Sequence, residues 1–190
     1  MVESVSKTIL DILIKNNAVT KDDRAIVLFG IEQGLRSVME VIVMLITAAL
    51  MNLFWQSVII LISFIPVRIY AGGYHAKTPM QCAVKSWMLL TAVLLWMKYI
   101  PGNVIIQISL FIVTGIWMII FCPIQDIHKL LRENEKSKYR FKAFRNYFIN
   151  ICVFCMGYIT GFQILSRCIA LAMFMVLLMM MAGTIKNKRR

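Results

Sequence analysis

A short polar stretch separates two long apolar runs of the chain and reads RIYAGGYHAKTPMQCAVK, residues 68–85. It holds His75, one of two histidines in the sequence, and Cys82 follows seven residues later. A cysteine beside a histidine is typical of a thiol nucleophile with its general base. On one straight helix, residues seven apart are separated by about 10.5 Å along the axis. The two side chains can therefore cooperate only if the helix is broken between them.

The residues between His75 and Cys82, and those just before them, predict such a break. Gly72 and Gly73 permit backbone angles that other residues avoid. Pro79 cannot lie inside a helix but suits its first position. Thr78 is a good N-cap, and Gln81 three residues later completes a capping-box pattern. The sequence predicts that one helix ends near the glycines and a new helix begins at Thr78.

This reading places Cys82 in the first turn of the new helix. Unpaired backbone N–H groups and the positive end of the helix dipole favour a thiolate there. The same N–H groups, with the side-chain amide of Gln81, can hold an oxyanion. His75 lies upstream of the break and can fold back over the thiol. The spacing alone also allows a buried structural cysteine and a solvated histidine.

The pattern RxxxGGxHAxxxxxC, which starts at Arg68, resembles the signature of the AgrB family, membrane-embedded cysteine endopeptidases of Gram-positive quorum sensing. The resemblance implies that His75 and Cys82 are the essential histidine and cysteine. It also implies functional importance for Arg68 and Gly73. A second, weaker similarity begins at Pro123. Because the length and the apolar segments also fit, the resemblance covers most of the chain.

The composition points to a membrane protein. Of the 190 residues, 60% are hydrophobic, more than a soluble domain carries. A formal charge of +12 would suggest nucleic acid as the partner of a soluble protein. Here the basic residues flank apolar runs, so the charge is better explained by topology and by a bilayer with anionic lipids. We therefore expect no nucleic-acid partner.

The cysteines give no sign of a disulfide framework or a metal site. The chain has five, an odd number, and most lie inside apolar runs. Cys152 and Cys155 share one helix face, but zinc or redox chemistry would need two further ligands or a soluble setting. We expect them, with Cys122 and Cys168, to pack between helices. No metal or cofactor is predicted.

The expected fold is an all-α polytopic membrane protein with about six transmembrane helices. The apolar region 38–67 would form a helix of about 45 Å, too long for a hydrocarbon core of roughly 30 Å, so we expect two spans with a turn near Asn52 to Gln56. The later spans are expected at 86–100, 104–122, 147–165 and 168–185. The predicted divisions are interfacial amphipathic helices at 1–35, a six-helix bundle at 36–185 with a catalytic loop at 68–85 and a basic loop at 123–146, and a basic tail at 186–190.

The distribution of charge predicts the orientation in the cell membrane. With six spans, every lysine and arginine except Lys98 and Arg167 falls on one side. The positive-inside rule then makes both termini cytoplasmic. It also places His75 and Cys82 at the cytoplasmic face, where a reducing compartment keeps the thiol free.

Three further residues have alternative roles. Glu40 lies within an expected span, where ionisable groups are costly and often functional, although Arg36 four residues earlier offers a simple ion pair. Glu40 or Asp126 is a candidate third member that orients His75. Arg68 either extends to the membrane surface from a helix end or holds a substrate carboxylate.

The resemblance implies that the substrate is an AgrD-like precursor peptide with an amphipathic leader, a central signal segment and an acidic tail. Cys82 would form an acyl-enzyme with loss of the tail, and a cysteine or serine of the peptide would then close a thiolactone or lactone. Family relatives are thought to form homodimers, so a dimer is a further expectation. The alternative is a small membrane transporter or peptide-binding scaffold without catalysis.

Overall fold

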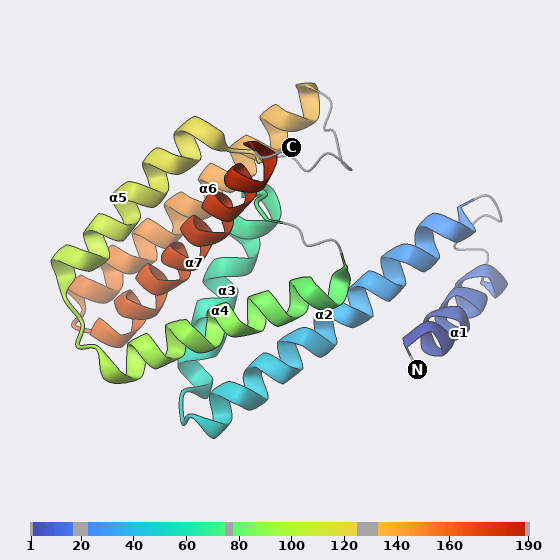
Figure 1. The fold of residues 1–190 in the computed structure, drawn as a ribbon, viewed down its shortest axis with the longest axis horizontal. Helices are drawn as coiled ribbons and strands as arrows, with labels where there is room; N and C mark the ends of the chain where they lie inside the picture. Colours follow the sequence, from blue (N-terminus) through green and yellow to red (C-terminus); the bar gives the residue numbers. More distant parts are fainter. Residues whose placement is uncertain (1, 17–22, 75–77, 125–132, 189–190) are drawn as a thin grey trace. The chain divides into compact units, whose positions relative to one another are not determined.

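The computed structural model describes residues 2–16, 23–74, 78–124 and 133–188, and seven α-helices lie in these ranges (Figure 1). No strand occurs in them. The predicted all-α fold with an N-terminal amphipathic helix is therefore confirmed. The helices are α1 (Val2–Lys15), α2 (Arg24–Leu50), α3 (Phe54–Ala71), α4 (Pro79–Tyr99), α5 (Val104–Phe121), α6 (Glu133–Ile159) and α7 (Gln163–Lys188).

Five of the described helices, α2, α3, α4, α5 and α7, are long and apolar enough to cross a membrane. A turn around Asn52, which has a positive φ of 60°, separates α2 from α3. The expectation of two helices with a turn in this region is therefore confirmed. The sixth expected span corresponds to α6, whose N-terminal half is rich in charge. The number of six spans stays a prediction.

Helix α6 has a low hydropathy because it carries many polar side chains. Several of these side chains donate hydrogen bonds to neighbouring helices. The Asn146 side-chain amide donates to the Pro66 carbonyl of α3 at 3.1 Å. The Tyr147 hydroxyl donates to the Phe111 carbonyl of α5 at 2.6 Å. Polar groups facing a neighbouring helix are a usual means of association between membrane helices. The low hydropathy of α6 is thus compatible with a place in the bundle.

The end of α6 differs from the expected span at 147–165. The helix stops at Ile159, and α7 begins at Gln163, before the expected start at Cys168. Gly161 in the intervening turn has φ of 79°, which breaks the helix. The apolar character continues through this turn at Phe162, so hydropathy alone does not mark the boundary.

Helix α7 is the centre of residues 47–190, the larger of two compact units. It packs against α3, α4, α5 and α6, and in Figure 1 α5, α6 and α7 run side by side. Its buried residues extend from Ser166 to Gly183. Several are methionines, whose flexible side chains fill irregular gaps. Elements that lie against α7 are thereby positioned relative to the whole bundle.

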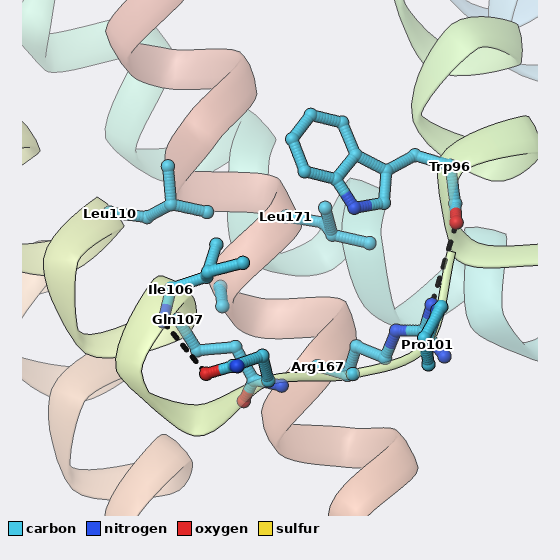
Figure 2. A pocket seen from close by; sticks show the side chains of 10 residues that line it. Trp96, Pro101, Ile106, Gln107, Leu110, Arg167 and Leu171 are labelled. Atoms are coloured by element: carbon cyan, nitrogen blue, oxygen red, sulfur yellow. Dashed lines mark hydrogen bonds between the residues drawn. The ribbon is translucent and has the colours of Figure 1, made fainter.

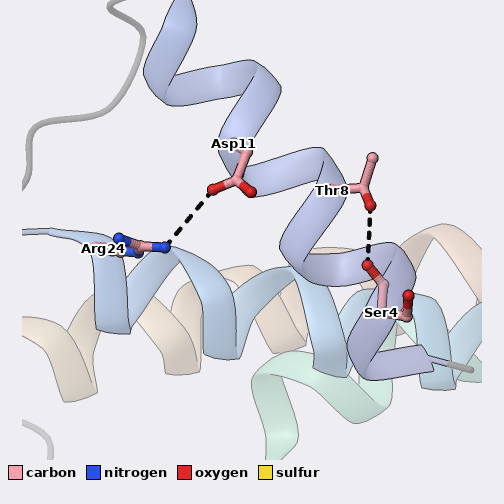
Figure 3. A network of polar contacts seen from close by, with 4 residues as sticks. All are labelled: Ser4, Thr8, Asp11 and Arg24. Atoms are coloured by element: carbon pink, nitrogen blue, oxygen red, sulfur yellow. Dashed lines mark hydrogen bonds and ion pairs between the residues drawn. The ribbon is translucent and has the colours of Figure 1, made fainter.

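The smaller unit, residues 1–46, contains α1 and most of α2. Arg24 at the start of α2 forms an ion pair of 3.6 Å with Asp11 of α1 (Figure 3). Both side chains are more than half exposed, so this pair contributes little to stability. Helix α2 runs without interruption through residues 35 and 36. The predicted boundary between the interfacial segment at 1–35 and the bundle at 36–185 therefore falls inside one continuous helix.

The two basic residues that the charge rule assigns to the other side both bond to the C-terminal ends of helices. Arg167 donates through Nη2 to the Trp96 carbonyl near the end of α4 (Figure 2) and to the carbonyl of Ile100, the C-cap residue. Lys98 donates through Nζ to the Met51 carbonyl after α2 at 3.5 Å. A cation at a helix C-terminus complements the negative end of the helix dipole. Beside Arg167 lies a small pocket, lined in part by Trp96, Ile106, Gln107, Leu110 and Leu171.

We predict that α7 crosses the membrane with its C-terminal end in the cytoplasm. Its 26 residues extend about 39 Å, enough for a hydrocarbon core of roughly 30 Å. In intact cells, a membrane-impermeant maleimide should label Gln163→Cys. It should label Lys188→Cys only after permeabilisation. Labelling is quantified on the peptide that contains the introduced cysteine. Labelling of Lys188→Cys from outside would reverse the orientation, and equal labelling of both would exclude a spanning α7.

Candidate functional site

The end of α3 is shaped by two glycines in positive-φ conformations. Gly72 has φ of 74° and Gly73 has φ of 134°, so the predicted need for glycine is confirmed at both positions. The Ile124 N–H donates to the Ala71 carbonyl at 2.9 Å, and Gly72 and Ile124 form a short parallel bridge. A Cβ on Gly72 would collide with the Ile124 carbonyl. The segment after α5 is therefore fastened to the start of the loop that leads to His75.

The next two residues of this loop lie directly on α7. The Tyr74 N–H donates to the Met179 carbonyl at 2.9 Å. A Cβ on Gly73 would lie 2.8 Å from that carbonyl oxygen. A Cβ on Gly183 would lie 2.6 to 2.8 Å from the backbone of Gly73 and Tyr74. The loop and α7 thus meet backbone to backbone, at a separation that only glycine permits.

Arg68, one turn before the end of α3, binds the loop that follows this helix. Its Nη2 donates to the Tyr74 carbonyl at 2.6 Å. The sequence allowed two roles for Arg68, one at the membrane surface and one in binding a substrate carboxylate. The structure adds a hydrogen bond from Arg68 to the backbone of the loop.

Helix α4 begins as the sequence predicts. Thr78 is the N-cap, with extended backbone angles, and Pro79 is the first helical residue. The Gln81 N–H donates to the Thr78 hydroxyl at 3.3 Å, and the Cys82 N–H donates to the Thr78 carbonyl at 3.2 Å. Cys82 is half-buried in the first turn. Since Thr78 already accepts these two N–H groups, an oxyanion needs other donors, such as the exposed Gln81 amide.

Three lysines lie close to the rings of Tyr70 and Tyr74, the two tyrosines of the motif. Lys85 donates through Nζ to the Tyr74 hydroxyl, and its Nζ lies 4.2 Å from the centre of the Tyr74 ring. Lys186 lies 5.4 Å from the same ring, and Lys142 lies 5.2 Å from the ring of Tyr70. The sequence motif did not single out these residues. The only signal in the sequence is the presence of Tyr70 and Tyr74 in a basic segment, because their lysine partners lie on other elements, α4, α6 and α7.

Three further residues were predicted to belong to the site. His75 and Asp126 lie outside the described residues. Glu40 is half-buried on α2 and belongs to residues 1–46, the other compact unit. Arg36, its expected partner, forms an ion pair of 3.7 Å with Glu32, on the preceding turn. The identity of a third member therefore stays open.

The cysteines other than Cys82 differ in their exposure. Cys122 and Cys168 are buried, as expected. Cys152 and Cys155 are exposed on α6, so the expectation that these two pack between helices is wrong. Within the part of the chain that the structure describes, no three side chains of His, Cys, Asp or Glu gather in a way that could hold a metal ion.

These features define an all-α membrane protein in which a glycine-containing break separates two apolar helices, with a cysteine in the first turn after the break. A family model, accessory gene regulator B, matches residues 6–180. The chain belongs to this family, which processes peptides in quorum sensing, and a precursor peptide is accordingly its partner. None of the curated proteins and none of the solved structures matches it.

We predict that Gly183→Ala lowers peptide processing by at least about tenfold, because the new Cβ displaces the loop at Gly73 and Tyr74. Gly34→Ala on α2 is the control, since a Cβ there meets nothing within 4 Å. It should retain activity and gain up to about 1 kcal/mol in helix propensity. Product is measured by mass spectrometry, and circular dichroism checks that both variants fold. Equal activity of the two variants would show that docking on α7 is unimportant.

Proposed function

We propose that the chain is a membrane-embedded cysteine endopeptidase that removes the C-terminal tail of an AgrD-like precursor and promotes cyclisation of the remaining peptide. The observation that carries this proposal is the position of Cys82. It lies in the first turn of α4, while Arg68 binds the loop that leads into His75. Nucleophile and base are thus supplied by the two sides of one break.

The first half-reaction transfers the peptide to the enzyme. His75 accepts the proton of the Cys82 thiol, and the sulfur attacks the carbonyl carbon at the start of the tail. The bond between carbon and nitrogen breaks, and the His75 imidazolium returns the proton to the departing amine. The products are a thioester on Cys82 and the free tail. Arg68 supplies a positive charge at the loop, and the Gln81 amide is the candidate oxyanion donor.

The second half-reaction closes the ring. A cysteine thiol or serine hydroxyl of the bound peptide loses its proton to His75 and attacks the thioester carbonyl. The Cys82 sulfur leaves and is protonated again, and the product is a thiolactone or lactone. Because the thioester retains the acyl group in activated form, ring closure needs no free carboxylate. It does require the second nucleophile to be held close and water to be kept out.

Asp126 is the better candidate than Glu40 for orienting His75. Ile124 is bonded to Ala71 at the start of the loop. Asp126 is two residues further along, so at most about 7 Å of chain separates it from this anchor. Glu40, on α2, is separated from the loop in the sequence by the whole of α3. Chain connectivity alone therefore keeps Asp126 near the site.

The proposed topology places this site at the cytoplasmic face, with both termini on the same side. Its support is the positive charge around the site, including Lys85, Lys142 and Lys186. The same charge favours a bilayer that contains anionic lipids. The divisions at 1–35, 36–185 and 186–190, and a homodimer, are parts of this proposal.

We predict an acyl-enzyme on Cys82. The purified protein is incubated with the precursor peptide and examined by intact-mass spectrometry, beside Cys82→Ala and His75→Ala. Wild type should gain the mass of the peptide without its tail, because the thioester retains only the acyl part. Cys82→Ala should gain none, and His75→Ala should form the adduct at least about 100-fold more slowly.

The other outcomes separate the alternatives. Cleavage that survives Cys82→Ala would exclude this thiol as the nucleophile. Absence of both adduct and cleavage, with the peptide still bound, would favour the peptide-binding scaffold or transporter.

We also propose that the basic part of α6 binds the acidic tail of the precursor. Lys138 and Arg145 are exposed there. The double variant Lys138→Glu with Arg145→Glu should raise KM by about three- to tenfold and leave kcat within about twofold, because the charges act on binding. The matched neutral variant, glutamine at both positions, should have a smaller effect. High salt should reduce the difference between the variants. An unchanged KM would remove α6 from substrate binding.

A further inference from the structure

Tyr74 is held from several directions, although it belongs to no helix. Its N–H donates to the Met179 carbonyl of α7 at 2.9 Å, and its carbonyl accepts from Arg68 of α3 at 2.6 Å. Its hydroxyl accepts from Lys85 of α4. Lys186 of α7 lies 5.4 Å from the ring centre. Residues of three helices, α3, α4 and α7, therefore contact this one residue.

The place of Tyr74 in the chain gives these contacts a consequence for the reaction. His75 is the next residue, so fixing the Tyr74 backbone fixes the point at which the His75 residue begins. Lys85 lies three residues after Cys82, and residues at this spacing are neighbours on a helix surface. The contact between Tyr74 and Lys85 thus joins the chain that carries the base to the helix face that carries the nucleophile.

The contact between Tyr74 and Lys85 combines two interactions that depend on orientation. The Lys85 ammonium donates to the hydroxyl oxygen and also lies 4.2 Å from the ring centre. Both interactions depend on direction, because the ammonium must point a proton at the hydroxyl oxygen and also lie near the ring. Together they favour one orientation of the first turn of α4 relative to the loop.

We infer that Tyr74 is a positioning residue that acts through Lys85 to hold Cys82 in register with His75. The inference rests on the proposed function. Tyr74 need not touch the substrate, and its loss should affect the chemical step rather than binding of the peptide. Misplacement of reacting groups by a fraction of an ångström to 1 Å is sufficient to slow a reaction by one to two orders of magnitude.

The test compares Tyr74→Phe, Lys85→Met and the double variant with matched controls on α4, Tyr99→Phe and Lys98→Met. The first readout is the rate at which iodoacetamide alkylates Cys82, followed on the peptide that contains it, with His75→Ala as the reference. The second readout is kcat and KM for removal of the tail. Lys85→Arg tests rescue, because it restores a cation and donor.

We expect Tyr74→Phe and Lys85→Met each to lower kcat by about tenfold with KM within about twofold, and to lower alkylation toward the rate of His75→Ala. The double variant should be no worse than about twofold below either single variant, because both remove one contact. Lys85→Arg should recover most of the rate. Circular dichroism checks folding, and if Tyr74→Phe does not fold, Lys85→Met with its rescue decides the question.

Two outcomes would overturn the inference, and they are distinguishable. If His75→Ala slows alkylation while Tyr74→Phe and Lys85→Met match the controls, the positioning role falls and the proposed function stands. If His75→Ala leaves alkylation and cleavage unchanged, the pairing of His75 with Cys82 falls, and the positioning inference falls with it.

Discussion

The structure depends on a close approach between the backbone of residues 72–74 and two distant segments. Gly72 meets Ile124, and Gly73 with Tyr74 meets Met179 and Gly183 of α7. No side chain fits between these backbones. The approach satisfies the Tyr74 N–H and the Ala71 carbonyl where a chain has just left a helix. In an apolar surrounding, leaving such groups unpaired would cost several kcal/mol each.

Helix α7 provides the surface for this approach. The loop docks on α7 through the Tyr74 N–H, and α3, α4, α5 and α6 pack against the same helix. Polar contacts supplement this packing, as where the Thr114 hydroxyl of α5 donates to the Met173 carbonyl at 3.3 Å. The bundle thereby presents Gly183 at a defined place, and the loop has a firm surface against which to order.

The local part of this arrangement could be predicted from sequence, because it depends on residues close together in the chain. The two glycines, the N-cap Thr78 and the first-turn position of Cys82 follow from the conformational preferences of each residue. The partners Ile124, Gly183 and Lys85 could not be found this way. Each is chosen by tertiary packing, and an isolated glycine in an apolar run carries no mark of what approaches it. The end of α6 was missed for a related reason, since apolar residues continue through the turn at Gly161.

The energy of ordering the loop suggests why its contacts should appear in kinetics rather than in folding. Fixing the backbone of a residue costs about 1–2 kcal/mol of conformational entropy. The hydrogen bonds that Tyr74 makes to Met179, Arg68 and Lys85 oppose this cost for Gly73 and Tyr74. Loss of one bond then shifts the loop toward loose states, while the helices, which are stabilised by their own packing, remain folded. A reaction that needs His75 and Cys82 in register is sensitive to that shift.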